Sequence, residues 1–282
     1  MSNKEKLSQL REKIDAIDSQ ILALISERAG CAQQVAEVKQ EAGDTNYFRP
    51  EREAQVLRDI MRKNQGPLGN EEIARLFREI MSACLALEQP IKVAFLGPEG
   101  TFTQEAALKH FGHSAVTEPL NAIDEVFREV DAGAVNYGVV PVENSTEGVI
   151  NHTLDTFLDS SLKICGEVEL RIHHHLLVGP STHKDTISRI YSHAQSLAQC
   201  RKWLDAHYPK AERVAVSSNA EAARRIKGEW NSAAIAGDMA AELYGLEKLS
   251  EKIEDRPDNS TRFLIIGREK IAIRAPKTEE CY

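Results

Sequence analysis

The sequence has no long uncharged apolar run, and its first residues lack the continuous apolar segment of a signal peptide. We therefore expect neither a membrane span nor export. It also lacks any dense lysine and arginine cluster and carries a net charge of -8, so nucleic acid is not an expected partner. The five cysteines are scattered without a CxxC pair. This pattern suits a reducing compartment and predicts a cytoplasmic protein.

The first 90 residues have helical periodicity. Apolar residues recur between Leu7 and Val38 at alternating steps of three and four, which predicts one long amphipathic helix. Shorter helices are expected to begin near Pro50 and after Gly66-Pro67. A helix of roughly 35 residues is about 50 Å long, more than the two shorter helices can cover. We therefore predict an intertwined homodimer formed through these helices.

Two cations interrupt the apolar side of the long helix. Arg28 occupies a position where the periodicity from Leu24 predicts a core residue, and Lys39 follows about three turns later on the same face. A buried cation needs a carboxylate partner. That partner could belong to a ligand, or the cations could reach solvent or pair with a neighbour such as Glu53. The pattern leaves both alternatives open.

Four segments of this region resemble the all-α chorismate mutases: L-R-E-K-I-D-x-I-D, L-I-S-E-R-A, A-x-x-V-x-x-V-K and R-P-E-R-E. The resemblance covers about residues 5 to 89. It implies that six residues hold chorismate: Arg11, Arg28, Lys39, Arg52, Glu53 and Glu88. Arg11 is expected to reach the site of the other subunit. Cys84 and Arg49 stand where some members of this family have a serine and an aspartate.

These residue types suit the reaction of that family. The Claisen rearrangement of chorismate needs a folded conformer and stabilised charge on the breaking ether oxygen, with no nucleophile or proton transfer. Arginines can hold the two carboxylates bidentately. Lys39 and Glu88 are the expected catalytic donors to the ether oxygen, Glu88 only when it is protonated. Glu53 is expected to accept a hydrogen bond from the ring hydroxyl.

After about residue 90 the pattern becomes one of short apolar segments separated by helical stretches, which predicts an α/β domain. The predicted strands are IKVAFLG, NYGVVPV, RIHHHLLV, RIYS, RVAVSS, AAIAG and TRFLIIG. In the third strand only His173 and His175 would share a side, and no cysteine or carboxylate completes a set of metal ligands. We predict a structural role for these histidines, with no metal and no cofactor.

Three of these strands lead into capping boxes, at Thr101–Gln104, Ser192–Gln195 and Ser218–Glu221. Each would start a helix at the carboxyl end of a strand, where open α/β sheets bind ligands and helix N-termini attract anions. A single capping box would indicate only a helix start. Three together favour a site for an anionic small molecule.

Five segments, in order along the chain, resemble the prephenate dehydratases: GPEGTFTQEAA, VPVENSTEG, SHAQSLAQC, SSNAEAA and NSTRFLIIG. The resemblance implies a fold like the type II periplasmic binding proteins, with substrate between two α/β lobes. It implies eight site residues: Glu143, Asn144, Ser145, Ser192, Gln199, Thr261, Arg262 and Phe263. Thr261 is the implied catalytic residue, a candidate donor to the departing ring hydroxyl. Asn144, Ser192 and Gln199 would orient carboxylates, while Arg262 would bind a carboxylate or brace the lobes.

Together the resemblances identify the sequence as a member of the bifunctional chorismate mutase/prephenate dehydratase family (P-proteins) of phenylalanine biosynthesis. We predict a mutase domain at residues 1–90, a dehydratase domain at 91–270 and a tail at 271–282. Chorismate and prephenate are the expected substrates. Two alternatives are a dehydratase that accepts arogenate and a binding module without catalysis.

The segment after Gly267 departs from the family pattern. Such enzymes usually continue into an ACT domain that binds phenylalanine, and its Gly-Ala-Leu and Glu-Ser-Arg-Pro motifs are absent here. We expect either a protein that phenylalanine does not inhibit or a truncated chain.

Overall fold

The computed structural model describes residues 3–43, 48–146 and 148–268 and separates into two compact units. Of the described residues, one unit contains those up to Ile91 together with Phe111–Ala115, and the other contains Lys92–His110 and those from Val116 to Arg268. The predicted tail at residues 271–282 lies outside the described residues. No described helix combines the length and apolar composition needed to cross a membrane.

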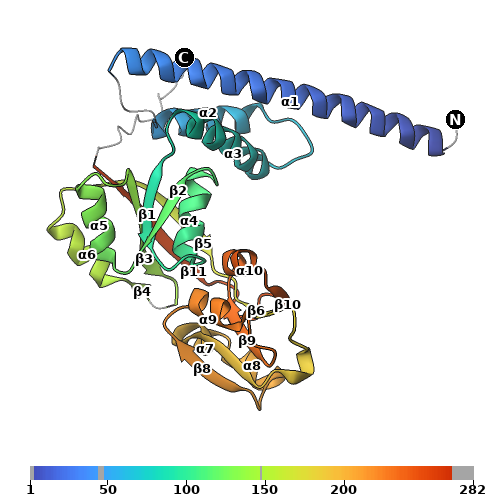
Figure 1. Cartoon of the computed structure of the whole chain (residues 1–282), viewed down its shortest axis with the longest axis vertical. Coiled ribbons are helices and arrows are strands. Elements are labelled where there is room, and N and C mark those ends of the chain that lie inside the picture. Colours follow the sequence, from blue (N-terminus) through green and yellow to red (C-terminus); the bar gives the residue numbers. More distant parts are fainter. Residues whose placement is uncertain (1–2, 44–47, 147, 269–282) are drawn as a thin grey trace, which may run out of the picture. The chain divides into compact units, whose positions relative to one another are not determined.

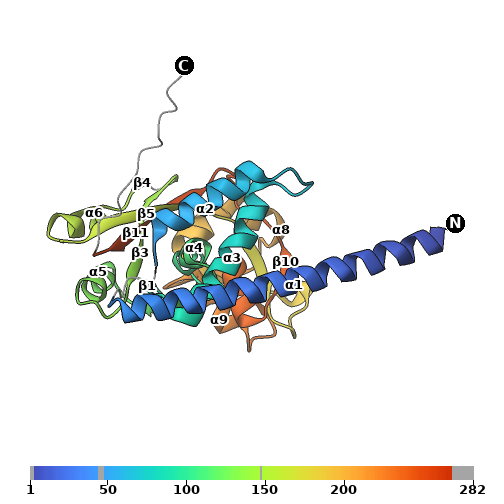
Figure 2. The same ribbon diagram turned by 90° about the horizontal axis from the view of Figure 1, so that it is seen from above.

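The helical unit contains the three predicted helices, α1 (Asn3–Glu41), α2 (Pro50–Lys63) and α3 (Asn70–Glu88). Pro50 begins α2 because its missing N–H leaves no helical hydrogen bond unmade at that position. α1 is unbroken over 39 residues, about 60 Å (Figures 1 and 2). In the single chain none of its residues is buried, and Leu7, Leu10, Ile14 and Ile17 are between 43% and 59% exposed.

The first lobe of the α/β unit is a mixed sheet. Its strands are β1 (Lys92–Leu96), β2 (Val116–Leu120), β3 (Tyr137–Asn144), β4 (Gly148–Val149), β5 (Lys163–Arg171) and β11 (Ser260–Gly267), in the order β2-β1-β3-β11-β5 with β4 beside β3. The helices are α4 (Phe102–Phe111), α5 (Ile123–Asp131) and α6 (Asn151–Leu158). Strands β1 to β3 are parallel because helices connect them. Val126, Phe127 and Ile266 lie in the core between α5 and the sheet.

The second lobe repeats this architecture. Its strands are β6 (His175–Val178), β7 (Arg189–His193), β8 (Glu212–Val216), β9 (Ser232–Ala236) and β10 (Glu247–Ser250), in the order β10-β6-β9-β7-β8. The helices are α7 (Ala194–Gln199), α8 (Arg201–His207), α9 (Asn219–Ile226) and α10 (Asp238–Tyr244), with a 3-10 turn, η1, at Lys184–Thr186. The chain returns to the first lobe as β11, antiparallel between β3 and β5 (Figure 1). The result is the expected two-lobed α/β fold.

One predicted strand, RIHHHLLV, is wrong. The segment breaks between β5 and β6, where the chain passes from one lobe to the other, so His173 and His174 lie outside any strand. The carboxylate of Glu254 occupies this break: its Oε2 accepts from the backbone N–H of His174 at 2.9 Å, and its Oε1 lies 2.8 Å from His173 Nδ1. The Glu254 side chain therefore accepts a hydrogen bond from a backbone N–H that would otherwise pair with a neighbouring strand.

Candidate active sites

Lys39 and Glu88 meet in the helical unit. Lys39 lies in the last turn of α1, and Glu88 ends α3, which packs against α1. Burial raises the pKa of Glu88, and the positive charge of Lys39 opposes this only in part. The buried Oε2 of Glu88 accepts no hydrogen bond from the described residues. The structure thus brings together two of the predicted site residues, with one carboxyl oxygen available to a ligand.

Glu53 has a partner that sequence reasoning missed. Its Oε1 lies 3.8 Å from Nε of Arg78 on α3, and only 20% of the Glu53 side chain is exposed. Burial raises the pKa of Glu53 to about 7, although the Arg78 charge lowers it. Because Arg78 occupies an ordinary helical position, no motif or break in periodicity marked it.

The other predicted cations lie on α1 and α2. Arg28 is half-buried, whereas Arg11 and Arg52 are exposed in the single chain. Arg52 Nη1 donates to Gln55 Oε1 on its own helix at 3.5 Å. Arg11 and Lys39 are 28 residues apart on the unbroken α1, or about 42 Å. One chain therefore cannot place both side chains on one small ligand.

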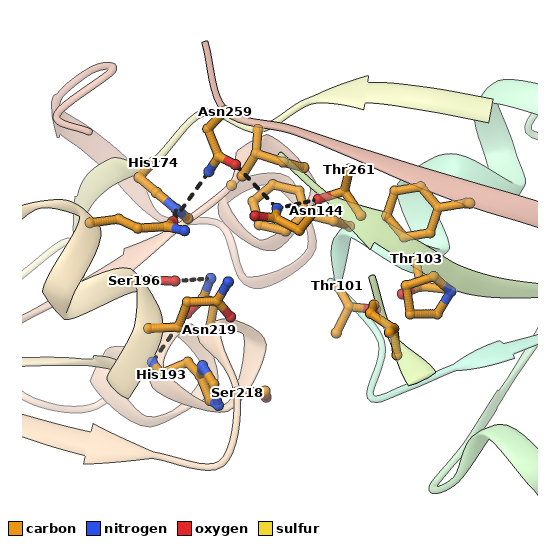
Figure 3. A pocket seen from close by; sticks show the side chains of 18 of the residues that line it. Thr101, Thr103, Asn144, His174, His193, Ser196, Ser218, Asn219, Asn259 and Thr261 are labelled. Atoms are coloured by element: carbon orange, nitrogen blue, oxygen red, sulfur yellow. Dashed lines mark hydrogen bonds between the residues drawn. The ribbon is translucent and has the colours of Figure 1, made fainter. Parts of the chain in front are cut away.

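A cavity of about 360 Å³ lies in the α/β unit, and both lobes contribute to its wall. Thr101, Thr103 and Asn144 come from the first lobe, and His193, Ser196, Ser218 and Asn219 from the second (Figure 3). None of the described lining residues is Lys, Arg, Asp or Glu. A ligand here meets amides, hydroxyls, imidazoles and helix N-termini, with apolar surface from side chains such as Ile150.

A chain of hydrogen bonds crosses the wall of this cavity and ends at Thr261 (Figure 3). His174 Nε2 lies 2.8 Å from Gln199 Oε1, which also accepts from Asn259 Nδ2 at 3.2 Å. Asn144 Nδ2 donates to Asn259 Oδ1 at 3.1 Å and to Thr261 Oγ1 at 2.8 Å. All five side chains line the cavity. Among them, Asn144, Gln199 and Thr261 were predicted, whereas His174 and Asn259 were missed.

Strand alternation separates the predicted residues of β11. Thr261 and Phe263 face the cavity, while Arg262 points to the opposite side of the sheet. There Arg262 Nη1 lies 2.8 Å from Glu143 Oε2, and Arg262 Nη2 lies 2.8 Å from Glu167 Oε2. Arg262 and Glu143 therefore join β11 to its neighbours β3 and β5 and do not line the cavity.

Two predicted serines also lie behind the cavity wall. Ser145 Oγ accepts from the backbone N–H of Ser260 at 2.9 Å and donates to the carbonyl of Asp258 at 3.3 Å. Ser192 is fully buried, with its hydroxyl 2.8 Å from both Asn219 Oδ1 and the Ile235 carbonyl. Asn219 does line the cavity. Both serines are thus placed to hold neighbouring segments.

The capping predictions have mixed outcomes. Ser218 Oγ accepts from the Glu221 N–H at 3.0 Å, which confirms the cap of α9. The cap at Ser192 is wrong, because this residue belongs to β7 and α7 begins two residues later. The Thr101 hydroxyl donates to the Leu96 carbonyl at 3.3 Å instead of capping α4. A motif of spacing alone does not distinguish these three environments.

The histidine run has three separate surroundings. His173 pairs with Glu254, His174 contacts Gln199, and His175 Nδ1 accepts from the backbone N–H of Lys252 at 3.2 Å. In the part of the chain that the structure describes, no group of three or more potential metal ligands gathers. The prediction of a purely structural run overlooked His174, which lines the cavity.

Comparison with known proteins identifies a family for each of the two regions. A model of the family "Chorismate mutase type II" matches residues 10–89, and one of the family "Prephenate dehydratase" matches residues 93–271. Two relatives are the bifunctional chorismate mutase/prephenate dehydratases of Stutzerimonas stutzeri and Pseudomonas aeruginosa, with sequence identities of 72% and 71%. Each alignment covers 96% of this chain and 75% of the relative. The chain belongs to the bifunctional chorismate mutase/prephenate dehydratase family.

A solved structure supports the assignment of the α/β unit within this family. The crystal structure of a prephenate dehydratase from Arthrobacter aurescens in complex with L-Phe is similar over 64% of this chain and 61% of that one. The sequence identity is 34% and the TM-score is 0.59.

Proposed function

We propose that this chain converts chorismate to prephenate in its helical domain and prephenate to phenylpyruvate in its α/β domain. Family membership over 96% of the chain supports both activities. The observation that carries the dehydratase assignment is a cavity whose described lining has no Lys, Arg, Asp or Glu and in which Asn144 donates to Thr261. We place the mutase domain at residues 1–90 and the dehydratase domain at 91–270, in keeping with the two family matches.

The mutase site is proposed to form only in a homodimer. Lys39 and Glu88 of one chain would face the ether oxygen of chorismate, while Arg28 and Arg52 hold its carboxylates. Glu53, whose pKa is raised to about 7, would accept from the ring hydroxyl. Arg11 lies about 42 Å from Lys39 on the same helix and would therefore act in the site of the second chain. The exposed apolar face of α1 is the surface available for this pairing.

The dehydratase site is proposed to act by hydrogen bonding. The carboxylate leaves as carbon dioxide while the electron pair of its broken bond enters the ring, and the ring hydroxyl accepts a proton and leaves as water. Thr261 would donate to that hydroxyl, and the bond from Asn144 would stabilise charge developing on Thr261 Oγ1. Apolar walls such as Ile150 and Phe263 would favour loss of the carboxylate, which they solvate poorly.

We also propose a cytoplasmic location. Among the described cysteines, Cys84 and Cys200 are buried free thiols and Cys31 is an exposed one. Free thiols are usual in a reducing compartment. Fractionation of the native host, with the enzyme followed by immunoblot, tests this location.

Turnover of the purified protein tests both activities. Incubation with chorismate should produce prephenate and then phenylpyruvate, followed by absorbance. Thr261→Ala should lower dehydratase turnover at least about 100-fold while mutase turnover stays unchanged. Loss of both activities would indicate a general folding defect, whereas unchanged dehydratase turnover would contradict the role of Thr261. Faster conversion of arogenate than of prephenate would favour the arogenate alternative, and binding without turnover would favour the binding module.

A further inference from the structure

Four side chains behind and along the cavity wall form a closed ring of hydrogen bonds. Gln199 Nε2 donates to Thr146 Oγ1 at 2.9 Å, and the Thr146 hydroxyl donates to Asn144 Oδ1 at 2.5 Å. Asn144 Nδ2 donates to Asn259 Oδ1 at 3.1 Å, and Asn259 Nδ2 donates back to Gln199 Oε1 at 3.2 Å. Each member donates to the next and accepts from the one before. The ring therefore has a single direction.

A backbone group fixes that direction. The N–H of Thr146 donates to Asn144 Oδ1 at 3.0 Å. A backbone N–H can only donate, so the amide oxygen of Asn144 must face Thr146. Its NH₂ group must then face Asn259 and Thr261, as the two distances from Nδ2 show.

The orientation of Asn144 decides what the Thr261 hydroxyl can do. Because Asn144 Nδ2 donates to Thr261 Oγ1 at 2.8 Å, the single hydrogen of that hydroxyl remains available to a ligand in the cavity that Thr261 lines. With the amide turned over, Asn144 Oδ1 would accept this hydrogen. Thr261 would then have no hydrogen to offer.

We propose that Thr146 and Asn259 are positioning residues for the dehydratase reaction, because they hold Asn144 in the orientation that leaves Thr261 a donor to the departing hydroxyl. This inference rests on the proposed function of the cavity. Thr146 is not among the described residues that line it. A substitution there acts on the reaction only through its neighbours, which makes it the sharper of the two tests.

The ring nitrogen of His174 that carries the hydrogen depends on the direction of the hydrogen-bond ring. Gln199 presents its oxygen to His174 Nε2 at 2.8 Å, so Nε2 carries the hydrogen. Nδ1 is buried without a hydrogen-bond partner among the described residues, and burial is the main cause that lowers the pKa of His174. The side chain is therefore neutral and protonated at Nε2. In a reversed ring the Gln199 NH₂ would face this nitrogen, and the hydrogen would move to Nδ1.

The test compares Thr146→Val, which removes the hydroxyl, with Thr146→Ser, which retains it. Thr156→Val is the matched control, since the Thr156 hydroxyl donates to the His152 carbonyl on its own helix, α6, at 2.8 Å. Dehydratase kcat and KM are measured with prephenate, and mutase turnover with chorismate in the same preparations. Thr146→Val should lower dehydratase kcat at least about tenfold with KM changed less than about threefold, and Thr146→Ser should restore most of kcat. Thr156→Val should behave as wild type.

Several outcomes would overturn the positioning role. These are an unchanged kcat in Thr146→Val, an equal loss in Thr146→Ser, or a loss confined to KM. If Thr146→Val does not fold, ¹⁵N NMR of His174 in the wild-type enzyme decides, and a hydrogen on Nδ1 would contradict the ring direction. If the wild-type protein turned over no prephenate, the proposed function itself would be wrong, and the positioning role would be wrong with it.

Discussion

At the scale of single residues, the protonation of Glu88 decides whether it can donate to the ether oxygen of chorismate. Burial raises its pKa, so the protonated donor persists to higher pH than in an ordinary glutamate and is lost as pH rises through the raised pKa. The wild-type mutase optimum should therefore lie on the acid side of the Glu88→Gln optimum, since an amide donates at every pH. Mutase rates measured across the pH range check this. Superimposable profiles for the two proteins would exclude the donor role.

Some of the residues predicted for the dehydratase site line the cavity and others do not. Asn144, Gln199, Thr261 and Phe263 were predicted and do line the cavity. Their neighbours in the same motifs, such as Arg262, were assigned to the site as well and face elsewhere. A motif identifies a segment, whereas the alternation of a strand decides which of its residues face the ligand. Asn259 and His174 could not be found by spacing, because the folding of separate segments places them beside Gln199.

At the scale of elements, Glu105 on α4 faces a cluster of charges and supplies a test of pH-dependent stability. Burial, with Asp238 and Glu242 of α10, raises the pKa of Glu105 from 4.5 to about 7, against the opposing charges of Lys109 and His173. A carboxyl whose pKa is raised on folding contributes stability below pH 4.5 that is lost as pH rises through about 7. The Tm of Glu105→Gln relative to wild type should therefore increase between about pH 5 and about pH 8.

The control for this prediction is Glu118→Gln, which changes an exposed carboxylate on β2. Its Tm difference from wild type should stay nearly constant over the same pH range. Equal pH dependence in the two variants would show that α4 and α10 do not perturb Glu105.

The presence of the helices and longer strands was predicted more accurately than the residues at which they end. All three helices of the first unit follow from periodicity, because a single apolar face repeats over many turns. The two-residue β4 and the polar, exposed β2 carry too little apolar pattern to be recognised. The break after β5 was missed because apolar residues continue through RIHHHLLV, and the contact with Glu254 that ends the strand comes from 80 residues later. Long-range contacts of this kind leave no local signal.

At the scale of the whole molecule, the single chain leaves the apolar face of α1 exposed to solvent. Leu10, Ile14 and Leu24 are between 55% and 63% exposed, which a monomer in water would not favour. Pairing with a second copy would cover this face and also bring Arg11 to a site about 42 Å from its own Lys39. In the proposed homodimer, the stability of the helical unit and the completeness of its site would depend on the same contact.

This dependence predicts complementation between two inactive variants. Arg11→Ala and Lys39→Ala should each lack mutase activity as homodimers. In a mixed dimer, one site combines the intact Lys39 of the first variant with the intact Arg11 of the second, while the other site lacks both. Random pairing gives half mixed dimers, each with one working site of two, so co-refolding should recover about a quarter of wild-type mutase activity.

The matched control pairs Arg28→Ala with Lys39→Ala. These residues lie 11 apart on one face of α1, about 16 Å, a span that two long side chains can bridge around one small ligand. Since both then serve the same site of the same chain, every site of a mixed dimer lacks one of them and no activity should return. Recovery in this pair, or none with Arg11→Ala, would mean that the two chains do not share the site in this way. Dehydratase turnover, measured in every mixture, should stay at the wild-type level because its cavity is built within one chain.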